Sequence, residues 1–395
     1  MLSQRTQLFT TSGTARARAA AAAAAASGKE VIDLTAGEIW AGLSPHIRAG
    51  AIAAIERGEN RYTDTIGLIE LRQALAERVS AESSAPWSAD EIAVTAGAKQ
   101  GLFHAAMLLI DPGQEVIIPA PYWTTFPAQV SLAGGTPVFV DTHASGYVPR
   151  LDDIKAAITP KTRAIIVNTP GNPTGAVYDR RTLCGIADLA LQHDLWIVFD
   201  ECYGAFAYEP GEHLNIVRLC PEVRNRTLLV NAFSKQLALT GWRVGYLAGP
   251  AAVIKAVKAL QSHTTSNPNV IAQHAVLNHM REGDGDYERD LRARLVRSRG
   301  IGLEILGGLK RVPMPGAQGG FYFYLDLSSL LVTARSSGEP RTADDVVNQL
   351  LEEGVATVSG TAFGDPHGVR VSYGAPADHL EKGLRRLVAV LDAWI

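Results

Sequence analysis

The chain has 395 residues, of which 47% are hydrophobic and 19% are charged, and its formal net charge at pH 7 is −3. This length exceeds the roughly 250–300 residues that one hydrophobic core supports, so we expect a globular protein of more than one domain, and the balanced charge gives no sign of a nucleic-acid partner. No apolar run approaches the ~20 residues of a membrane span, and three cysteines without CxxC spacing support neither a disulfide framework nor a zinc site, so we expect a cytoplasmic protein without a metal.

The first biased segment is an alanine run at residues 19–26, which several arginines and no acid precede. Alanine is the best helix former, Ser12 and Thr14 can cap a helix, and Gly28 can end it. An arginine-rich transit peptide has a similar composition. We favour the first helix of the fold over a targeting signal.

Short apolar runs rich in β-branched residues then alternate with helical patterns. The runs cover residues 115–119, 136–141, 164–168, 195–200 and 227–231. Because these runs lack polar alternation, they predict strands that are buried on both faces. Helical patterns such as residues 101–110 and 182–192 lie between them. This alternation predicts an α/β fold with a mostly parallel sheet wrapped by helices.

The pattern changes after residue 286. A charged helix is predicted at residues 287–306 and an amphipathic helix at residues 343–353, and the chain closes on another helix. Between them stand two strand-like runs, residues 321–325 and 369–373. This part of the chain predicts a smaller α+β domain.

Polar side chains follow three of the predicted strands, at the edge where open α/β sheets bind their ligands. Asp200 ends the run LWIVFD, Asn172 lies in the turn NTPGNPTG, and Lys235 follows the run TLLVN. Taken alone, Asp200 fits a helix cap equally well and Asn172 fits turn chemistry. The stretch NAFSKQLALTGWRVGY (residues 231–246) contains no acid, so a desolvated Lys235 is suited to act as a nucleophile and Arg243 is free to meet an anion.

A candidate anion site lies at residues 95–100, TAGAKQ, which open a predicted helix whose backbone N–H groups can bind a phosphate. The spacings of a P-loop and of a dinucleotide fingerprint are both missing. Pyridoxal phosphate requires a lysine, an acid, hydrogen-bond donors, an anion site with an arginine, and an aromatic ring such as Trp123. We therefore predict pyridoxal 5'-phosphate as the cofactor.

At these residues the sequence resembles the class I and II aminotransferases, which are fold-type I pyridoxal-phosphate enzymes, and among them the bacterial aspartate aminotransferase subgroup. The resemblance runs from about Ser12 to the C-terminus. The motifs that carry it are LTAGE (34–38), YTDTIGLIELR (62–72), VTAGAKQ (94–100), PYW (121–123), NTPGNPTGAVY (168–178), FDECY (199–203), SK with GWRVGY (234–246), TTSNP (264–268) and VRVSY (369–373). Motifs this specific, in this order, leave little room for coincidence.

The resemblance implies a role for each matching residue. Lys235 forms the Schiff base and moves the proton at the substrate Cα, and Asp200 pairs with the pyridine nitrogen. Tyr203 donates to the ring oxygen and completes the catalytic set. The residues implied to contact the cofactor are Tyr62 from the neighbouring subunit, Gly97, Ala98, Lys99, Trp123, Asn172, Asp200, Tyr203, Ser234, Lys235 and Arg243.

The substrate residues follow in the same way. Arg370 is implied to bind the substrate α-carboxylate, since its guanidinium suits a bidentate contact. The residues implied to border the substrate are Gly37, Trp40, Lys99, Trp123, Asn172 and Arg370. The implied reaction moves an amino group from an L-amino acid to a 2-oxo acid such as 2-oxoglutarate in a ping-pong cycle.

The resemblance also implies a fold and an assembly. A large cofactor-binding domain at residues 45–286 would hold a mostly parallel seven-stranded sheet. Residues 287–395 would form the small C-terminal domain, which the N-terminal segment at residues 1–44 joins. Two identical chains would form a homodimer with shared active sites.

Two positions depart from the family pattern, and a third feature leaves the substrate open. Ala232 stands where many relatives carry a phosphate-binding serine, and whether Ser234 replaces it stays open. Trp40 stands where the subgroup has a PDF segment and favours an aromatic or bulky substrate. Ser12, Thr14 and Lys99 match positions that help to bind the distal carboxylate of aspartate or glutamate. Lys99 fits a solvated helix face equally well.

Two alternative functions remain. The same fold and cofactor residues serve lyases, synthases and oxidases, so other pyridoxal-phosphate chemistry is an alternative. A non-catalytic ligand sensor of a transcription regulator is a second alternative, but we expect the short segment of 33 residues before LTAGE to be too small for a winged helix, and Lys235 is intact.

Overall fold

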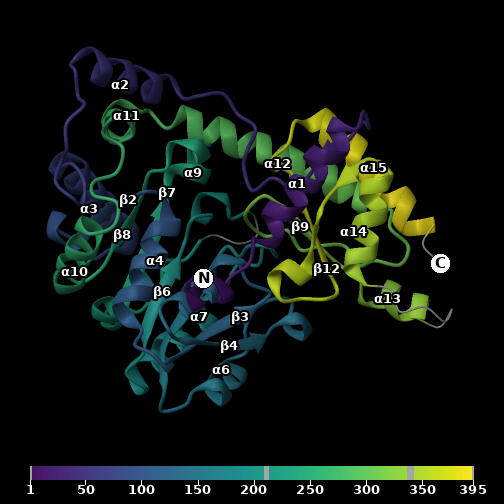
Figure 1. Cartoon of the computed structure of the whole chain (residues 1–395), viewed down its shortest axis with the longest axis horizontal. Coiled ribbons are helices and arrows are strands. Elements are labelled where there is room, and N and C mark those ends of the chain that lie inside the picture. The colour runs from purple at the N-terminus through teal and green to yellow at the C-terminus, as the bar shows by residue number, and fades with distance from the viewer. Residues whose placement is uncertain (1, 209–212, 336–341, 394–395) are drawn as a thin grey trace.

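A seven-stranded sheet with strand order β2-β8-β7-β6-β5-β3-β4 forms the centre of the fold (Figure 1). In this computed structural model, which describes residues 2–208, 213–335 and 342–393, β3 to β7 are parallel, and β8 runs antiparallel to its neighbours β2 and β7. The strands are β2 (Ile92–Thr95), β3 (Glu115–Ala120), β4 (Thr136–Asp141), β5 (Thr162–Asn168), β6 (Trp196–Asp200), β7 (Thr227–Ala232) and β8 (Gly245–Ala248). The α/β class and the mostly parallel sheet are thus confirmed.

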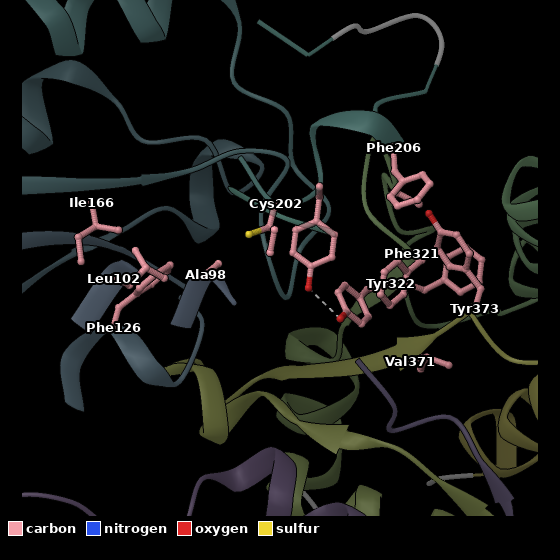
Figure 2. Close-up of a cluster of buried hydrophobic side chains, with 14 of the residues drawn as sticks. Ala98, Leu102, Phe126, Ile166, Cys202, Phe206, Phe321, Tyr322, Val371 and Tyr373 are labelled. Carbon is pink, nitrogen blue, oxygen red and sulfur yellow. Dashed lines mark hydrogen bonds between the residues drawn. The ribbon is translucent and has the colours of Figure 1, made fainter. Parts of the chain in front are cut away.

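The sheet separates two hydrophobic cores, because successive residues of a strand point to opposite faces. On β5, Ile166 packs with Leu102 of helix α4 (Ala98–Leu109), whereas Ile165 belongs to the core on the other face. Leu183 of helix α7 (Arg180–Gln192) lies in that second core. Figure 2 shows Leu102, Ile166 and Phe126 grouped in the first core.

The prediction of burial on both faces is wrong for β4. This strand ends the strand order and pairs only with β3, and most of its residues are partly or fully exposed. Phe139 is 48% exposed and stacks on Tyr122 with ring centroids 4.8 Å apart. An apolar run therefore marked the strand but not its place at the edge of the sheet.

Further helices lie along the chain in the part of the structure that is described. They are α2 (Pro45–Glu56), α3 (Ile69–Ser83), α5 (Thr125–Leu132), α6 (Leu151–Ala157), α8 (Ile216–Leu219), α9 (Phe233–Gln236), α10 (Ala251–Ser262) and α11 (Val270–Glu282). None of the described helices is both long and apolar enough to cross a membrane. The long α12 (Asp286–Leu306) matches the predicted charged helix and leads to the C-terminal part of the fold (Figure 1).

The C-terminal part is built on a three-stranded antiparallel sheet of order β11-β12-β9, made of β9 (Tyr322–Asp326), β11 (Val358–Ser359) and β12 (Gly368–Ser372). Helices α13 (Ser328–Arg335), α14 (Ala343–Glu352) and α15 (Ala377–Ala393) accompany it. The predicted strands and the amphipathic helix of this region are confirmed. Figure 2 shows its aromatic core, where Phe206 meets Phe321 and Tyr373.

The beginning of the chain joins this C-terminal part. Strand β1 (Ile32–Asp33) pairs in parallel with β10 (Val355–Ala356), and helix α1 (Gly13–Ala26) lies against β10 and β11 (Figure 1). The predicted first helix is confirmed: the Ser12 hydroxyl caps it by accepting from the Ala15 N–H at 3.3 Å. Thr14 lies inside the helix and not at its cap.

Candidate active site

The carboxyl ends of β5, β6 and β7 open into a cavity of about 420 Å³. Asn168 at the end of β5 pairs in register with Asp200 at the end of β6. The cavity brings together most of the residues singled out in the sequence, namely Gly37, Ala98, Lys99, Trp123, Asn172, Asp200, Tyr203, Ser234, Lys235, Arg243 and Arg370. Residues far apart in the chain thus meet at the sheet edge where the parallel strands end.

Lys235 lies on α9, directly after β7. Its ammonium donates to the carbonyl of Gly37 and lies 5.9 Å from the ring centre of Tyr203 and 5.8 Å from that of Phe321. Among the described residues no acid forms an ion pair with it. Lys235 is therefore an amine at the cavity wall, held by a carbonyl and two aromatic rings.

Two acids, Glu38 and Asp200, line the cavity. Asp200 is the more deeply buried of the two and is only 4% exposed. The backbone N–H of Cys202 donates to its Oδ1 at 3.1 Å. Burial raises the pKa of Asp200 to about 6, against the lowering effect of the Cys202 N–H, and the neighbouring Glu201 raises it further. A carboxylate that is so poorly solvated gains from a cationic partner.

Tyr203 is buried and shares a hydrogen bond of 3.0 Å with the hydroxyl of Tyr322, drawn as a dashed line in Figure 2. Burial, together with Tyr322, raises the pKa of Tyr203 well above its usual range. The phenol therefore stays protonated and can donate a hydrogen bond. Tyr322 comes from β9, so this contact joins the large sheet to the C-terminal sheet.

Arg370, on β12, is 2% exposed and forms no ion pair with any described acid. Its Nη1 donates to Asn172 Oδ1 at 3.0 Å and its Nη2 donates to the Thr35 carbonyl at 2.7 Å. The guanidinium lies 4.4 Å from the ring centre of Tyr322. A buried charge with only neutral partners is costly, so this arginine is suited to an anionic ligand.

Gly97 and Ala98 begin helix α4 beside Arg243. Gly97 has φ +79°, and a Cβ there would stand 2.7 Å from Arg243 Nη2. Within the described part of the chain, the Arg243 guanidinium donates to the carbonyls of Thr240, at 3.0 Å, and Ala96, at 3.3 Å, and pairs with no acid. A helix N-terminus and an arginine without an acid partner together make an anion site of the kind that binds phosphate.

Lys99 and Trp123 stand together at the rim of the cavity, where the Lys99 ammonium lies 5.0 Å from the Trp123 ring centre. Desolvation lowers the pKa of Lys99, and the nearby cations Arg243 and Lys235 lower it further. Thr14 of α1 also lines the cavity, and its hydroxyl lies 3.2 Å from that of Ser12. An anion near Lys99 would offset the repulsion among these cations.

Three of the predicted residues, Gly97, Tyr62 and Trp40, do not line this cavity, although Gly97 directly precedes Ala98, which does. Tyr62 is 88% exposed and Trp40 is 77% exposed in the single chain. The roles of Tyr62 in a neighbouring subunit's site and of Trp40 beside the substrate stay predictions.

The cavity also contains residues that the sequence did not single out. They are Arg18, Asn168, Cys202, Thr240, Tyr322 and, apart from its place in LTAGE, Glu38. Glu38 accepts from Arg18 Nη2 at 2.9 Å and from the Thr240 hydroxyl at 2.8 Å. This contact joins α1 to the loop before β8, and no sequence spacing indicates it. The run FYFYL (residues 321–325) predicted a strand that contains Tyr322, but nothing in the sequence indicated that this tyrosine lines the cavity.

The arrangement fits pyridoxal 5'-phosphate. Arg370 and Arg243 are cations without acid partners, Asp200 is a desolvated carboxylate, and Lys235 is an amine on the same cavity. No cluster of His, Cys, Asp and Glu suited to a metal occurs within residues 2–208, 213–335 and 342–393. The donor set is thus one for an aromatic, anionic aldehyde cofactor and its carboxylate substrates.

The chain is similar in sequence and in fold to known aminotransferases. Over 99% of this chain, it is 40% identical to the aspartate/prephenate aminotransferase of Thermus thermophilus, covering 98% of that protein, and 36% identical to the aspartate aminotransferase of Geobacillus stearothermophilus, covering 99%. Solved structures of aspartate aminotransferase from Thermus thermophilus with maleate and from Rhizobium meliloti match with TM-scores of 0.90 and 0.93 at 38% and 35% identity, each over 99% of both chains. Residues 29–387 match the family Aminotransferase class I and II. The chain belongs to this family of fold-type I enzymes, and it is a pyridoxal-phosphate-dependent aminotransferase.

Proposed function

We propose that this aminotransferase uses a dicarboxylic amino acid, aspartate or glutamate, with a 2-oxo acid such as 2-oxoglutarate as acceptor. The observation that carries the proposal is that two cationic side chains, Arg370 and Lys99, line the same cavity. Arg370 suits the α-carboxylate, and Lys99 with Thr14 suits a second, distal carboxylate. The relatives named for aspartate, and the Thermus thermophilus structure with the dicarboxylate maleate, support the same substrate class.

The residues of this chain have distinct tasks in the proposed reaction. When bound, the cofactor's ring withdraws electrons from the substrate Cα, which no side chain can do. Asp200 holds a proton at the ring nitrogen, and Tyr203 and the amide NH2 of Asn172 donate to the ring oxygen. The Asn172 amide is set for this task because its Oδ1 is already occupied by Arg370 at 3.0 Å.

Lys235 performs the proton transfer. With cofactor and substrate bound, its Nζ would be the base that takes the proton from the substrate Cα and the acid that later gives this proton back. Its hydrogen bond to the Gly37 carbonyl keeps the amine at the cavity wall. The phosphate is bound by Arg243, Ser234 and the N–H groups of Gly97 and Ala98, and Ser234 replaces the hydroxyl that is missing at Ala232.

The assembly is a homodimer, in which Tyr62 of each chain completes the site of the other. The high exposure of Tyr62 supports this role, because a tyrosine that is 88% exposed is available to a second chain. Residues 45–286 form the cofactor-binding domain, and residues 1–44 join residues 287–395 in the small domain. The pairing of β1 with β10 supports that division.

A scan of half-reactions tests the substrate class. The holoenzyme is mixed with one amino acid at a time, and the visible absorbance of the bound cofactor is followed. Loss of that absorbance with aspartate and glutamate, and release of the matching 2-oxo acid, is the expected result. A response confined to aromatic or basic amino acids would refute the dicarboxylate class, and release of ammonia would indicate a lyase.

Subunit mixing tests the shared site. Lys235→Ala and Tyr62→Phe chains, each of low activity alone, should regain activity when they are unfolded and refolded together, since one site of the mixed dimer is then intact. The Lys235→Ala protein alone should show no turnover. Absence of recovery, with mixed dimers shown to form, would exclude a contribution of Tyr62 across the interface.

A further inference from the structure

A second buried acid, Glu201, lies directly after Asp200 and takes no part in the chemistry above. It is only 3% exposed. Its Oε2 lies 2.8 Å from His213 Nε2 and accepts from Asn215 Nδ2 at 3.1 Å. We propose that Glu201 and His213 form a positioning pair for Asp200: they set the charge next to this carboxylate and hold the turn after β6 that carries Tyr203.

The backbone places the two acids on opposite sides of the sheet. Successive residues at a strand end point to opposite faces, so Asp200 lines the cavity whereas Glu201 does not. The Glu201 N–H donates to the Val230 carbonyl of β7 at 3.1 Å, and its carbonyl accepts from the Gly204 N–H at 2.9 Å. Glu201 therefore ties the end of β6 to its neighbour strand and to the turn that holds Tyr203.

His213 packs against the turn that follows Tyr203. A Cβ on Gly204 would stand 2.8 Å from His213 Cδ2, so the imidazole packs directly on the backbone after Tyr203. Its other neighbour is the ring of Phe199, 6.1 Å away between centroids. Asn215, which also binds Glu201, caps helix α8 by accepting from the N–H groups of Val217 and Arg218.

The charges around Glu201 give the pair its electrostatic role. Arg78 of α3 and Tyr246 of β8 interact with Glu201 through space, as do Asp200 and Cys202 on its own segment. His213 supplies the direct proton donor and Asn215 a neutral one. Two adjacent carboxylates in a buried place disfavour each other's ionisation, so the positive charge that a protonated His213 places on Glu201 would offset this repulsion and favour the ionised Asp200 that the cofactor nitrogen needs.

The inference depends on the proposed role of Asp200 and is tested by cofactor affinity, not by turnover. The dissociation constant of pyridoxal phosphate is measured on the full-length, cofactor-free chain across pH for the wild type, Glu201→Gln, His213→Ala and the double variant. Affinity should fall at acid pH as Asp200 becomes protonated. Because ionisation of the free cofactor is the same for every variant, differences between the curves belong to the protein.

The acid limb of each curve is the pH range over which the affinity for the cofactor falls as the pH is lowered. The two single variants should move this acid limb in opposite directions. Glu201→Gln removes the neighbouring charge and should move it to lower pH, whereas His213→Ala leaves Glu201 without its donor and should move it to higher pH. We expect a shift of about half to one pH unit each way, which corresponds to about a three- to tenfold change in the dissociation constant below the limb. The double variant should return towards the wild-type curve.

A matched control comes from a second histidine–glutamate pair, the buried His279 and the partly exposed Glu288, whose Nε2–Oε1 distance is also 2.8 Å and which does not line the active-site cavity. His279→Ala should leave the curve unchanged. Thermal unfolding of each variant shows whether it is folded. Limbs that stay in place, or that move in the same direction in both single variants, would reduce Glu201 and His213 to structural residues and overturn the inference.

Failure of the inference is distinct from failure of the proposed function. If Asp200→Asn abolishes the acid limb while the pair variants leave it in place, only the inference is wrong. If Asp200→Asn keeps both the limb and the wild-type affinity, Asp200 is not the partner of the ring nitrogen, and its role in the proposed reaction is wrong as well.

Discussion

Replacing Asp200 by asparagine should stabilise the cofactor-free protein although it removes activity. Burial raises the pKa of this carboxyl from 3.8 to about 6. A difference of about 2 units corresponds to about 3 kcal/mol of unfolding free energy at ~1.36 kcal/mol per unit. Because Asp200 is only 4% exposed, solvent screening takes little from this figure.

The sign follows from proton binding. The folded chain holds this proton to a higher pH than the unfolded chain does, so stability is lost as pH rises from about 4 to about 6, and the whole cost is present above that range. Asparagine carries no charge and avoids the cost. Its Oδ1 keeps the acceptor for the Cys202 N–H at 3.1 Å, and water in the cavity can bind its NH2 group.

Urea unfolding of the cofactor-free proteins measures the effect at about pH 8 and below about pH 4. We expect Asp200→Asn to be more stable by about 3 kcal/mol at the higher pH and equal to the wild type at the lower pH. The holoenzyme should show the opposite order, because the wild-type carboxylate then has its cationic partner. A cofactor-free variant that is equally or less stable near pH 8 would refute the reasoning.

Three further substitutions test other parts of the site. Arg370→Lys should lower kcat/KM for both substrates by about 10- to 100-fold, because an ammonium cannot keep the forked contacts of the guanidinium, and unchanged kinetics would exclude carboxylate binding there. Lys99→Gln should lower kcat/KM for aspartate by about tenfold and leave a monocarboxylic amino acid unaffected, so an equal loss for both would contradict the distal-carboxylate role. Gly97→Ala should weaken cofactor binding by about tenfold in equilibrium titrations, since the new Cβ meets Arg243 Nη2 at 2.7 Å with φ at +79°. Gly28→Ala is its control, because φ is +89° there with no heavy atom within 4 Å, and equal affinity of both variants would show that crowding of the arginine has no effect.

The sequence predicted those parts of the site that depend on the ends of strands. Asp200 and Lys235 follow apolar runs, and parallel strands bring their carboxyl ends to one edge, so their meeting could be inferred without coordinates. The helix start at Gly97 was likewise visible from small residues after a short apolar run. The resemblance to a family then supplied Arg370, which the run VRVSY alone did not distinguish from a surface arginine.

Other features depend on contacts between distant segments, for which a single sequence has no local signal. The contact of Arg18 with Glu38 and the loop closure by His213 are of this kind. Exposure at the sheet edge was also hidden, since β4 is as apolar in sequence as the central strands. Strand β8 was not predicted, because it is short and overlaps the stretch of residues 231–246 that contains Lys235 and Arg243.

The pairing of β1 with β10 has a consequence for how the protein is made. Every strand of the large sheet lies between Ile92 and Ala248, so a nascent chain can build that sheet while its last third is still untranslated. Ile32 must wait for Val355 to leave the ribosome before it finds its partner. Thr14 and Arg370 line one cavity although they are far apart in the chain. A chain that terminates before Arg370 therefore lacks a residue of the site even when its large sheet is complete.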